Sequence, residues 1–541
     1  MRPLTLVLAV ALGATAQAQE ISGDRIRAHV RFLASDLLEG RGTGARGGQL
    51  ASEYIATQFE LIGAKPAGDN GTYFQNVPLV GIDTQPDSRL SAVGKGGTLA
   101  FRWLDDFVGK NQRQKPDEKF DGEAVFVGHG IVAPEFQWDD FKGVDVRGKV
   151  IVLFTNEPPS SSEKFFGGPA LTYYGRWTYK FEQAVRVGAV GAIIIHTTPT
   201  AGYGWNVVRN SWGREESYVK LRPREPELAL AGWLTEEAGG RLLAASGRTV
   251  PELLKLADSR EFKPIPLGVR ISGEMHSKIR EVNTRNVAAV ISGSDPALRQ
   301  ETVIFSAHWD HLGIGPVVDG DPIYNGAVDN ATGCAMLLEI ARAWASLEQK
   351  PRRSALFLSV TAEEDGLRGS EYYATHPLAP PGKTALALNF DGFQPFGRTM
   401  DVVVNGANRT TFWPQVQDAA ERMDLLIRPD PRPEQGHYYR SDHFSYAKVG
   451  IPAFSVSQGE EVLGRPEGYG KKLFGDYNAR HYHQPSDGYG EGWDFAGMVQ
   501  VAQFGFLLGQ SAANLEQLPT WNPGDEFLGA REKSGVSSAA R

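Results

Sequence analysis

The chain has one cysteine and no long apolar run, and these two absences narrow what it can be. With only Cys334 among 541 residues, no intrachain disulfide can form, so the fold depends on its core and on any bound metal. A membrane-spanning helix needs about 20 consecutive apolar residues, and no stretch of the sequence reaches that length. Long blocks of one charge sign are also absent although the net charge is −8, which argues against a nucleic-acid partner.

The first residues have the order of an export signal. A positively charged start is followed by an apolar stretch at 4–12 and a small-residue site at 16–18. This order predicts a secretory signal peptide over residues 1–18, cleaved before Gln19. A short membrane anchor is the weaker alternative, because the apolar stretch is well below the roughly 20 residues needed to span a bilayer. We therefore expect a periplasmic or secreted protein without a membrane span.

From Val269 onward, strand patterns alternate with helix patterns. The strand-like runs lie at residues 286–291, 302–307, 354–361, 384–390, 401–404 and 451–456. Such alternation predicts an α/β fold, a three-layer sandwich around a mostly parallel mixed sheet.

The length of the chain exceeds one ordinary core, so more than one domain is expected. A change in sequence pattern near Lys115 and a charged, proline-containing stretch at 256–266 indicate the limits of a separate domain. The predicted division follows the signal peptide with a first part at 19–117, this domain at 118–266, the main part at 267–520 and a disordered tail at 521–541.

Residues that can bind a metal follow the predicted strands. Such residues are His308 and Asp310, Asp329 at a helix start, Glu363 and Glu364, Asp391, and further on His483. Open α/β sheets bind ligands at the carboxyl ends of their strands, so these side chains should face one crevice. Imidazole and carboxylate together suit zinc, whereas calcium and magnesium take all-oxygen shells. Asp310 could also hold the far ring nitrogen of His308 and fix its tautomer.

Each of these residues taken singly has an ordinary explanation. A histidine at a strand end is commonly a packing residue, and adjacent glutamates commonly mark a solvated turn. Their number is harder to dismiss, because seven of the eleven histidines lie between His308 and His483. The sequence therefore favours a metal centre over a set of unrelated polar residues.

Several segments, taken in this order, resemble the co-catalytic di-zinc aminopeptidase family. That family includes bacterial leucyl aminopeptidases and glutamate carboxypeptidases. The matching segments are HWDHLG (308–313), GAVDNATG (326–333), TAEEDGLRGS (361–370), NFDG (389–392), SDHFSYAKVGIPA (441–453) and YHQPSD (482–487). The likeness covers Val269 to about Leu515, and residues 21–76 resemble the family's N-terminal helices. Within residues 118–266, GVDVRGKVIVLF (143–154) and KFEQAVRVGAVGAIIIH (180–196) resemble a protease-associated domain. The resemblance implies a peptidase domain interrupted by this β-rich insert.

The resemblance implies two zinc ions per chain, which cobalt or manganese could replace. By position in the matching segments, the implied metal ligands are His308, Asp329, Glu364, Asp391 and His483. His308 and Asp391 would bind one ion, Glu364 and His483 the other, and Asp329 would bridge the two.

The resemblance also implies the catalytic residues. Glu363 would be the general base and Tyr482 a donor to the tetrahedral oxyanion. The chemistry would use a hydroxide bridging two metals about 3.5–4 Å apart. The peptide bond between Asp329 and Asn330 would be cis.

The function that follows is a secreted or periplasmic zinc-dependent aminopeptidase, which removes N-terminal residues from peptides with a free N-terminus. A carboxypeptidase of the glutamate carboxypeptidase type is the alternative, and it would need cations for a C-terminal carboxylate, available in Arg368, Arg440, Arg465 and Arg480. A glutaminyl cyclase or a non-catalytic receptor of this architecture would have lost part of the ligand set. The full set argues against these last two.

Overall fold

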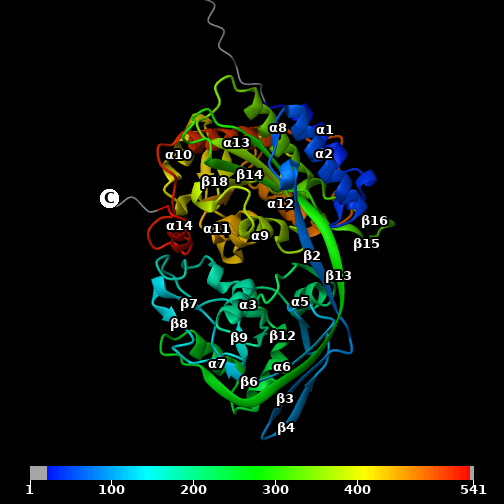
Figure 1. The fold of residues 1–541 in the computed structure, drawn as a ribbon, viewed down its shortest axis with the longest axis vertical. Helices are drawn as coiled ribbons and strands as arrows, with labels where there is room; N and C mark the ends of the chain where they lie inside the picture. The colour runs from blue at the N-terminus through cyan, green and yellow to red at the C-terminus, as the bar shows by residue number, and fades with distance from the viewer. Residues whose placement is uncertain (1–20, 537–541) are drawn as a thin grey trace, which may run out of the picture.

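The computed structural model describes residues 21–536 as two bodies joined by long strands (Figure 1). We call residues 21–76 with 287–536 the upper body, and residues 89–264 the lower body. The predicted signal peptide, residues 1–18, lies outside the described residues. Among residues 21–536, no helix has both the length and the apolar character to cross a bilayer.

The upper body is built on a mixed sheet whose strand order is β21-β18-β14-β17-β13. Four of these strands run parallel, namely β14 (Thr302–His308), β17 (Ser354–Val360), β18 (Thr384–Asn389) and β21 (Ala453–Ser455). The long β13 (Ile265–Ile291) is antiparallel to β17. All the residues of β14, β17 and β18 are buried, as expected for parallel strands covered on both faces.

Helices cover both faces of this sheet, so the upper body has three layers. One face packs against α1 (Gly23–Leu33), α2 (Arg46–Ile62), α8 (Thr332–Ser346), α10 (Trp413–Arg422) and α13 (Ala496–Asn514). The other face packs against α9 (Arg368–Thr375) and α11 (His443–Lys448). On β14 the alternation is direct, since Val303 and Phe305 join the first layer and Ile304 joins the second. The predicted α/β sandwich around a mostly parallel mixed sheet is confirmed.

The remaining upper-body elements lie around this sandwich. They are β1 (Lys65–Pro66), β15 (Gly313–Val318), β16 (Asp321–Tyr324), β19 (Asp401–Val403), β20 (Leu426–Arg428), β22 (Ser457–Gln458), α12 (Tyr469–Arg480) and α14 (Leu528–Lys533).

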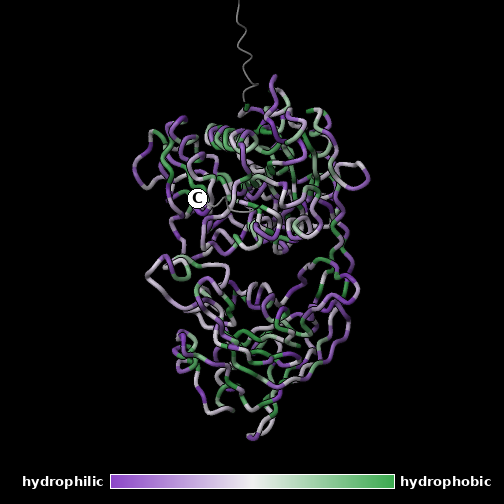
Figure 2. Tube along the Cα trace, turned by 60° about the vertical axis from the view of Figure 1, so that its left-hand side comes forward, coloured by the Kyte–Doolittle hydropathy of each residue, from purple (hydrophilic) through white to green (hydrophobic). Residues whose placement is uncertain are grey.

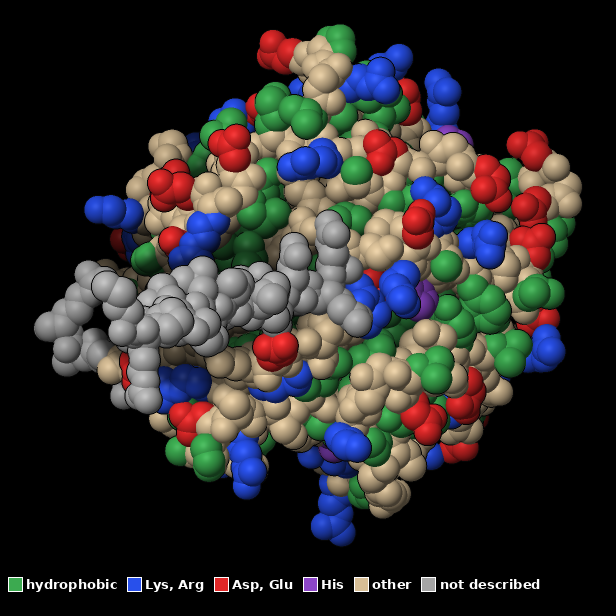
Figure 3. Space-filling view, turned by 90° about the horizontal axis from the view of Figure 1, so that it is seen from above, with side chains coloured by type: hydrophobic (Ala, Val, Ile, Leu, Met, Phe, Trp, Pro, Cys, Tyr) green, Lys and Arg blue, Asp and Glu red, His purple; other side chains and the backbone are tan. Residues whose placement is uncertain are grey.

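In Figure 2 the hydrophobic segments gather inside each body and the hydrophilic ones run along its outside. Seen from above in Figure 3, positive and negative side chains are interspersed over this face.

The lower body has its own sheet, ordered β6-β9-β10-β12-β5. These strands are β6 (Asp117–Phe126), β9 (Val150–Phe154), β10 (Gly191–Ile195), β12 (Leu230–Leu234) and β5 (Phe107–Lys110). The helices are α3 (Trp177–Arg186), α4 (Thr198–Ala201), α5 (Trp205–Trp212), α6 (Glu236–Ala244) and α7 (Val250–Ala257), and the shorter strands are β3 (Arg89–Gly94), β4 (Gly97–Phe101), β7 (Val132–Ala133), β8 (Trp138–Asp139) and β11 (Glu216–Val219).

The predicted start of the insert, at residue 118, is too late. Leu90, Phe101 and Phe107 belong to the same hydrophobic core as the strands of the lower body. The edge strand β5 pairs with β12, more than 100 residues further along the chain. Sequence reasoning missed this because the pairing partner of an edge strand is set by tertiary contacts. The lower body therefore begins near Arg89.

Two long strands, β13 and β2 (Phe74–Thr84), connect the bodies. β13 pairs with β6 and β3 at its lower end, with β2 along its middle and with β17 at its upper end. The sequence predicted a domain boundary at 256–266 and a strand at 286–291. In the structure β13 begins within that stretch, at Ile265, and continues to Ile291 with a register shift between Pro266 and Arg270.

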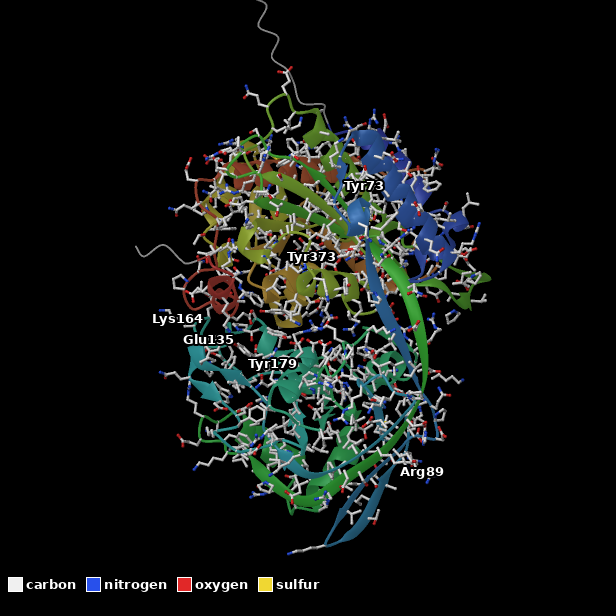
Figure 4. All side chains as sticks on the ribbon, viewed as in Figure 1. Tyr73, Arg89, Glu135, Lys164, Tyr179 and Tyr373 are labelled. Atoms are coloured by element: carbon white, nitrogen blue, oxygen red, sulfur yellow. The ribbon has the colours of Figure 1, made fainter. Side chains whose placement is uncertain are left out.

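Side chains also join the bodies along the face of α11. Lys448 of α11 forms a 2.7 Å ion pair with Glu182 of α3, and the rings of Tyr173 and Phe444 meet edge to face. Figure 4 labels Glu135 and Lys164, which lie in the lower body near the boundary between the two bodies. Both line a cavity to which the upper body also contributes residues.

The predicted disordered tail, 521–541, is wrong for the part that the structure describes. Trp521 is fully buried and its indole donates to the carbonyl of Gly450. Arg531 of α14 is also buried, and its guanidinium donates to the carbonyls of Pro381, Thr384 and Pro519. The polar composition of this segment suggested disorder, but a few apolar residues and one buried arginine dock it onto the sheet.

Replacing Arg531 by Met should lower the free energy of unfolding by about 3 kcal/mol or more, because several buried carbonyls would lose a charged donor. Urea denaturation followed by circular dichroism measures this. Lys533→Met on the same helix is the matched control, since Lys533 is exposed and should change stability by less than about 0.5 kcal/mol. Equal stability of the two variants would show that α14 is not docked.

Candidate metal centre

The carboxylate of Asp329 lies between two imidazoles. Its Oδ1 is 3.2 Å from Nε2 of His308, and its Oδ2 is 3.3 Å from Nε2 of His483. Two nitrogen lone pairs that face the two oxygens of one carboxylate match a pair of cations sharing a bridging ligand. Asp329 is therefore the centre of the site.

His308 and Asp391 make up one side of the site. His308 ends β14, and its Nε2 lies 3.2 Å from Oδ1 of Asp391, which follows β18. The other oxygen of Asp391 accepts a 2.7 Å hydrogen bond from the hydroxyl of Ser441. The other ring nitrogen of His308, Nδ1, lies 3.2 Å from the carbonyl of Asp310. With Nδ1–H donating to that carbonyl, Nε2 keeps its lone pair for a metal.

Glu364 and His483 make up the other side. Nε2 of His483 lies 3.0 Å from Oε2 of Glu364. A third imidazole approaches here, since Nδ1 of His311 is 2.6 Å from Oε1 of the same glutamate. Within the described residues two groups have metal-ligand spacing: His308 with Asp329 and Asp391, and His311 with Asp329 and Glu364. His483 is in neither group, although it contacts Glu364 and Asp329.

Asp310 fixes the loop that carries both glutamates. Its Oδ1 accepts from the backbone N–H of Glu363 at 3.1 Å, and its Oδ2 accepts from that of Glu364 at 3.3 Å. The sequence predicted that this carboxylate holds His308, and Oδ1 does lie 3.7 Å from Nδ1. The backbone carbonyl of Asp310 is the closer acceptor for the ring, so the carboxylate acts mainly on the glutamate loop.

The backbone on either side of Asp329 is also held. Asp487 accepts from the N–H groups of Val328 and Asp329, at 3.0 and 3.2 Å. The amide of Asn330 donates to the carbonyl of Phe390, just before the ligand Asp391. The peptide bond between Asp329 and Asn330 is cis, as the family resemblance implied.

Arg41 ties together two of the segments that form the site. It is buried, and its guanidinium donates to the carbonyls of Trp309, Asn325, Gly326 and Leu33 at 2.6–2.8 Å. Trp309 directly follows His308, and Asn325 and Gly326 lie just before Asp329. No sequence motif marked this role, because a buried arginine bonded only to carbonyls leaves no spacing pattern.

The pKa shifts of the site residues indicate that a cation would stabilise the site. Burial raises the pKa of Glu363, and Asp391 and Glu364 raise it further, although His308 opposes the shift. Burial lowers the pKa of His308, but the carboxylates of Asp391 and Glu363 more than reverse this and raise it well above its usual value. Carboxylates gathered in a low-dielectric site need cations nearby.

The donor set fits zinc or a similar ion. It combines imidazole nitrogens with carboxylate oxygens, as zinc prefers. Oε1 of Glu364, Nε2 of His483 and both ring nitrogens of His311 are buried without a hydrogen bond within the described residues. Unpartnered atoms that converge on one point are the expected form of an ion site.

The structure brings all five sequence-predicted ligands together, with Glu363 and Asp310 beside them. Tyr482 lies next to the site with its ring stacked on His483, 3.9 Å between centroids. Packing against neighbours, and then the charges of Asp329 and Glu364, raise its pKa, so the phenol keeps its proton. The contributions of Arg41, Ser441 and Asp487 were not predicted from the sequence.

Comparison with known proteins finds sequence similarity to peptidases. The model of peptidase family M28 matches residues 286–502. The aminopeptidase NAALADL1 of Rattus norvegicus is 29% identical over 170 residues, 29% of this chain and 21% of that protein. The probable leucine aminopeptidase 2 of Aspergillus oryzae is 33% identical over 141 residues, 26% of this chain and 24% of that protein. The chain thus spans about a quarter or less of these relatives.

A solved structure, the aminopeptidase from Aneurinibacillus sp. strain AM-1, is similar along most of the chain. The identity is 18%, the alignment covers 94% of this chain and 98% of that one, and the TM-score is 0.47.

Replacing Arg41 by Met should destabilise the protein by about 3 kcal/mol or more, because several buried carbonyls would lose their charged donor. It should also weaken metal binding, since the segments before Asp329 and after His308 would no longer be tied together. Urea denaturation and calorimetric zinc titration measure the two effects. Arg46→Met is the control, because the Arg46 side chain is 72% exposed. If Arg41→Met matched Arg46→Met in both measurements, the bracing role would be wrong.

Proposed function

Because this chain carries a domain of peptidase family M28 over residues 286–502, we propose that it is a zinc-dependent aminopeptidase that acts on peptides with a free N-terminus. The observation that carries the proposal is the placement of the Asp329 carboxylate between His308 and His483, one oxygen facing each ring. This arrangement suits two ions and a hydrolytic reaction.

In this proposal each ion has its own pair of ligands and shares a third. His308 and Asp391 hold one ion, Glu364 and His483 hold the other, and Asp329 lies between them. The 3.0–3.3 Å separations of the ligand atoms support this division. Ser441 donates a hydrogen bond to the carboxylate of Asp391, and Asp310 accepts one from the backbone N–H of Glu364, as supporting residues do around metal sites.

Bound zinc would polarise the scissile carbonyl and lower the pKa of a water to near neutral. Glu363 then acts as general base, taking a proton from the attacking water and giving it to the leaving amine. The two adjacent glutamates have different roles in this proposal. Glu364 faces two imidazoles and would bind the ion, whereas Glu363 stays free to transfer the proton.

In this proposal Tyr482 assists at the carbonyl oxygen. Its ring stacks on the proposed ligand His483 and its side chain is 47% exposed, which supports an approach of the hydroxyl to a bound substrate. A protonated phenol can donate to the oxygen as negative charge develops there.

The relatives named as aminopeptidases favour an N-terminal over a C-terminal recognition mode. In this proposal the ammonium group of a free N-terminus docks beside the carboxylates of the site, whose charge two bound zinc ions would offset. Two of the arginines that a carboxypeptidase could use to bind a C-terminal carboxylate already contact other groups of the protein. The guanidinium of Arg368 donates to Ser217 and Glu371 and lies over Tyr218, and Arg465 lies over the ring of Tyr469.

The proposal extends to location and to the lower body. The sequence pattern of residues 1–18 supports export to the periplasm or the medium. The lower body would be a protease-associated domain, for which its parallel strands β9 and β10, within the two matching segments, give support.

Replacing Glu363 by Gln should keep both ions but reduce kcat by about 10²–10⁴-fold, because the general base is lost. Glu364→Gln should instead weaken zinc binding by at least about 10–100-fold, the range seen when groups that support metal ligands are removed. Steady-state kinetics and zinc titration separate the two effects. The same metal loss and the same kinetics in both variants would overturn the division of labour between these neighbours.

Acetylating the N-terminus of a good peptide substrate should reduce kcat/KM by about 10²-fold or more, equivalent to about 2.7 kcal/mol of transition-state binding. The charge that the site recognises would be gone, and the acetyl group would add bulk where the chain must end. Amidating the C-terminus of the same peptide is the matched control and should have little effect. The reverse pattern would identify a carboxypeptidase.

A further inference from the structure

His311 is the imidazole near the site to which the expected ligand set gives no role. It lies three residues after His308 in the loop that follows β14, and it is only 2% exposed. Its Nδ1 is 2.6 Å from Oε1 of Glu364. Its ring centroid is 5.7 Å from that of His483, with the ring planes 73° apart. His311 and His483 therefore approach the two oxygens of one glutamate.

The polar atoms of His311 have no hydrogen bond. Both ring nitrogens and Oε1 of Glu364 are buried and unpartnered within the described residues. Nδ1 and Oε1 are close enough to bond, but the hydrogen on Nδ1 would not point at the oxygen. A buried polar group left unpaired destabilises the fold. A cation bound by both atoms would satisfy both at once, since imidazole nitrogen and carboxylate oxygen are both zinc ligands.

The backbone opposite the ring is adapted to leave it room. Gly326 has φ of +57°, and a Cβ there would come within 2.4 Å of Cγ of the His311 ring. Arg41 holds both sides, since its guanidinium donates to the carbonyl of Gly326 and its own carbonyl accepts from the N–H of His311. Contacts with Gly326 and Arg41 therefore fix the position of the His311 ring.

We propose that His311 binds, through Nδ1, the same ion as Asp329, Glu364 and His483. This inference rests on the proposed function and refines it. The two ions then differ, because one has four protein ligands and the other only Asp329, His308 and Asp391. An ion with four protein ligands has a closed shell, whereas an ion with three keeps an open position for substrate. The ion held by His308, Asp329 and Asp391 would then keep a position open for the substrate carbonyl, and the ion at His311 would be the more tightly held one.

An alternative is that His311 only positions Glu364 through a hydrogen bond. In that case its removal would change the orientation of the carboxylate, but not the number of imidazoles bound to the ions. X-ray absorption of the zinc-loaded protein counts those imidazoles through their outer-shell scattering, independently of activity. The two roles can therefore be separated.

The experiment uses the full chain stripped of metal and titrated calorimetrically with zinc. His311→Ala should lose about 10²-fold or more in affinity for one ion, at or above the range for residues that merely support ligands, and keep the affinity for the other. The zinc-loaded variant should show less imidazole scattering than the wild type. His29→Ala is the matched control, because His29 is a half-buried histidine that contacts Tyr54 away from the site. It should behave as the wild type.

The outcomes distinguish this inference from the proposed function. If the wild type takes up two ions and His311→Ala takes up both with unchanged affinity and unchanged scattering, the inference is wrong while the function stands. If affinity falls but the scattering is unchanged, His311 is a positioning residue and the inference is also wrong. If the wild type takes up fewer than two ions, both fail. His311→Asn, which keeps a polar side chain of smaller size, provides the same readings if the alanine variant does not fold.

Discussion

The sharing of one buried carboxylate between two imidazoles is the interaction on which the site depends. Asp329 can face both His308 and His483 only if its backbone is fixed to within a few tenths of an ångström. Asp487, Asn330 and Arg41 fix it from three directions through hydrogen bonds to backbone groups. Carboxylates and imidazoles gathered in this way are costly to bury without a cation, so the fold and the proposed metals stabilise each other.

The sheet explains why residues far apart in the chain reach this point. β14, β17 and β18 run parallel and adjacent, so their carboxyl ends lie along one edge. His308, Glu363 and Asp391 stand at or just after those ends. The strands are held by buried apolar residues on both faces, so the distances at the edge are set by the spacing of the strands rather than by flexible loops.

The two bodies are linked next to the reacting groups as well as through β13. The loop that carries Glu363 and Glu364 leads directly into α9, which begins at Arg368. Arg368 donates to the carbonyl of Ser217 in β11, and β11 itself pairs with β2. A continuous set of contacts therefore runs from the lower body to the glutamate loop, and a displacement of β11 would act on Glu363 through the first turn of α9.

Local patterns in the sequence determined the kind of fold and the identity of most site residues. Strand–helix alternation predicted the α/β sandwich, because the period of apolar residues depends on local geometry. The rule that ligands collect at strand ends placed His308, Glu364 and Asp391 in one site, and the family resemblance supplied their pairing. Tertiary structure alone decided the rest. The start of the lower body, the docking of Arg531 and the bracing by Arg41 depend on partners between 8 and 285 residues away. The closeness of His311 to Glu364 has the same origin, because a distance across a folded loop leaves no period or spacing in the sequence.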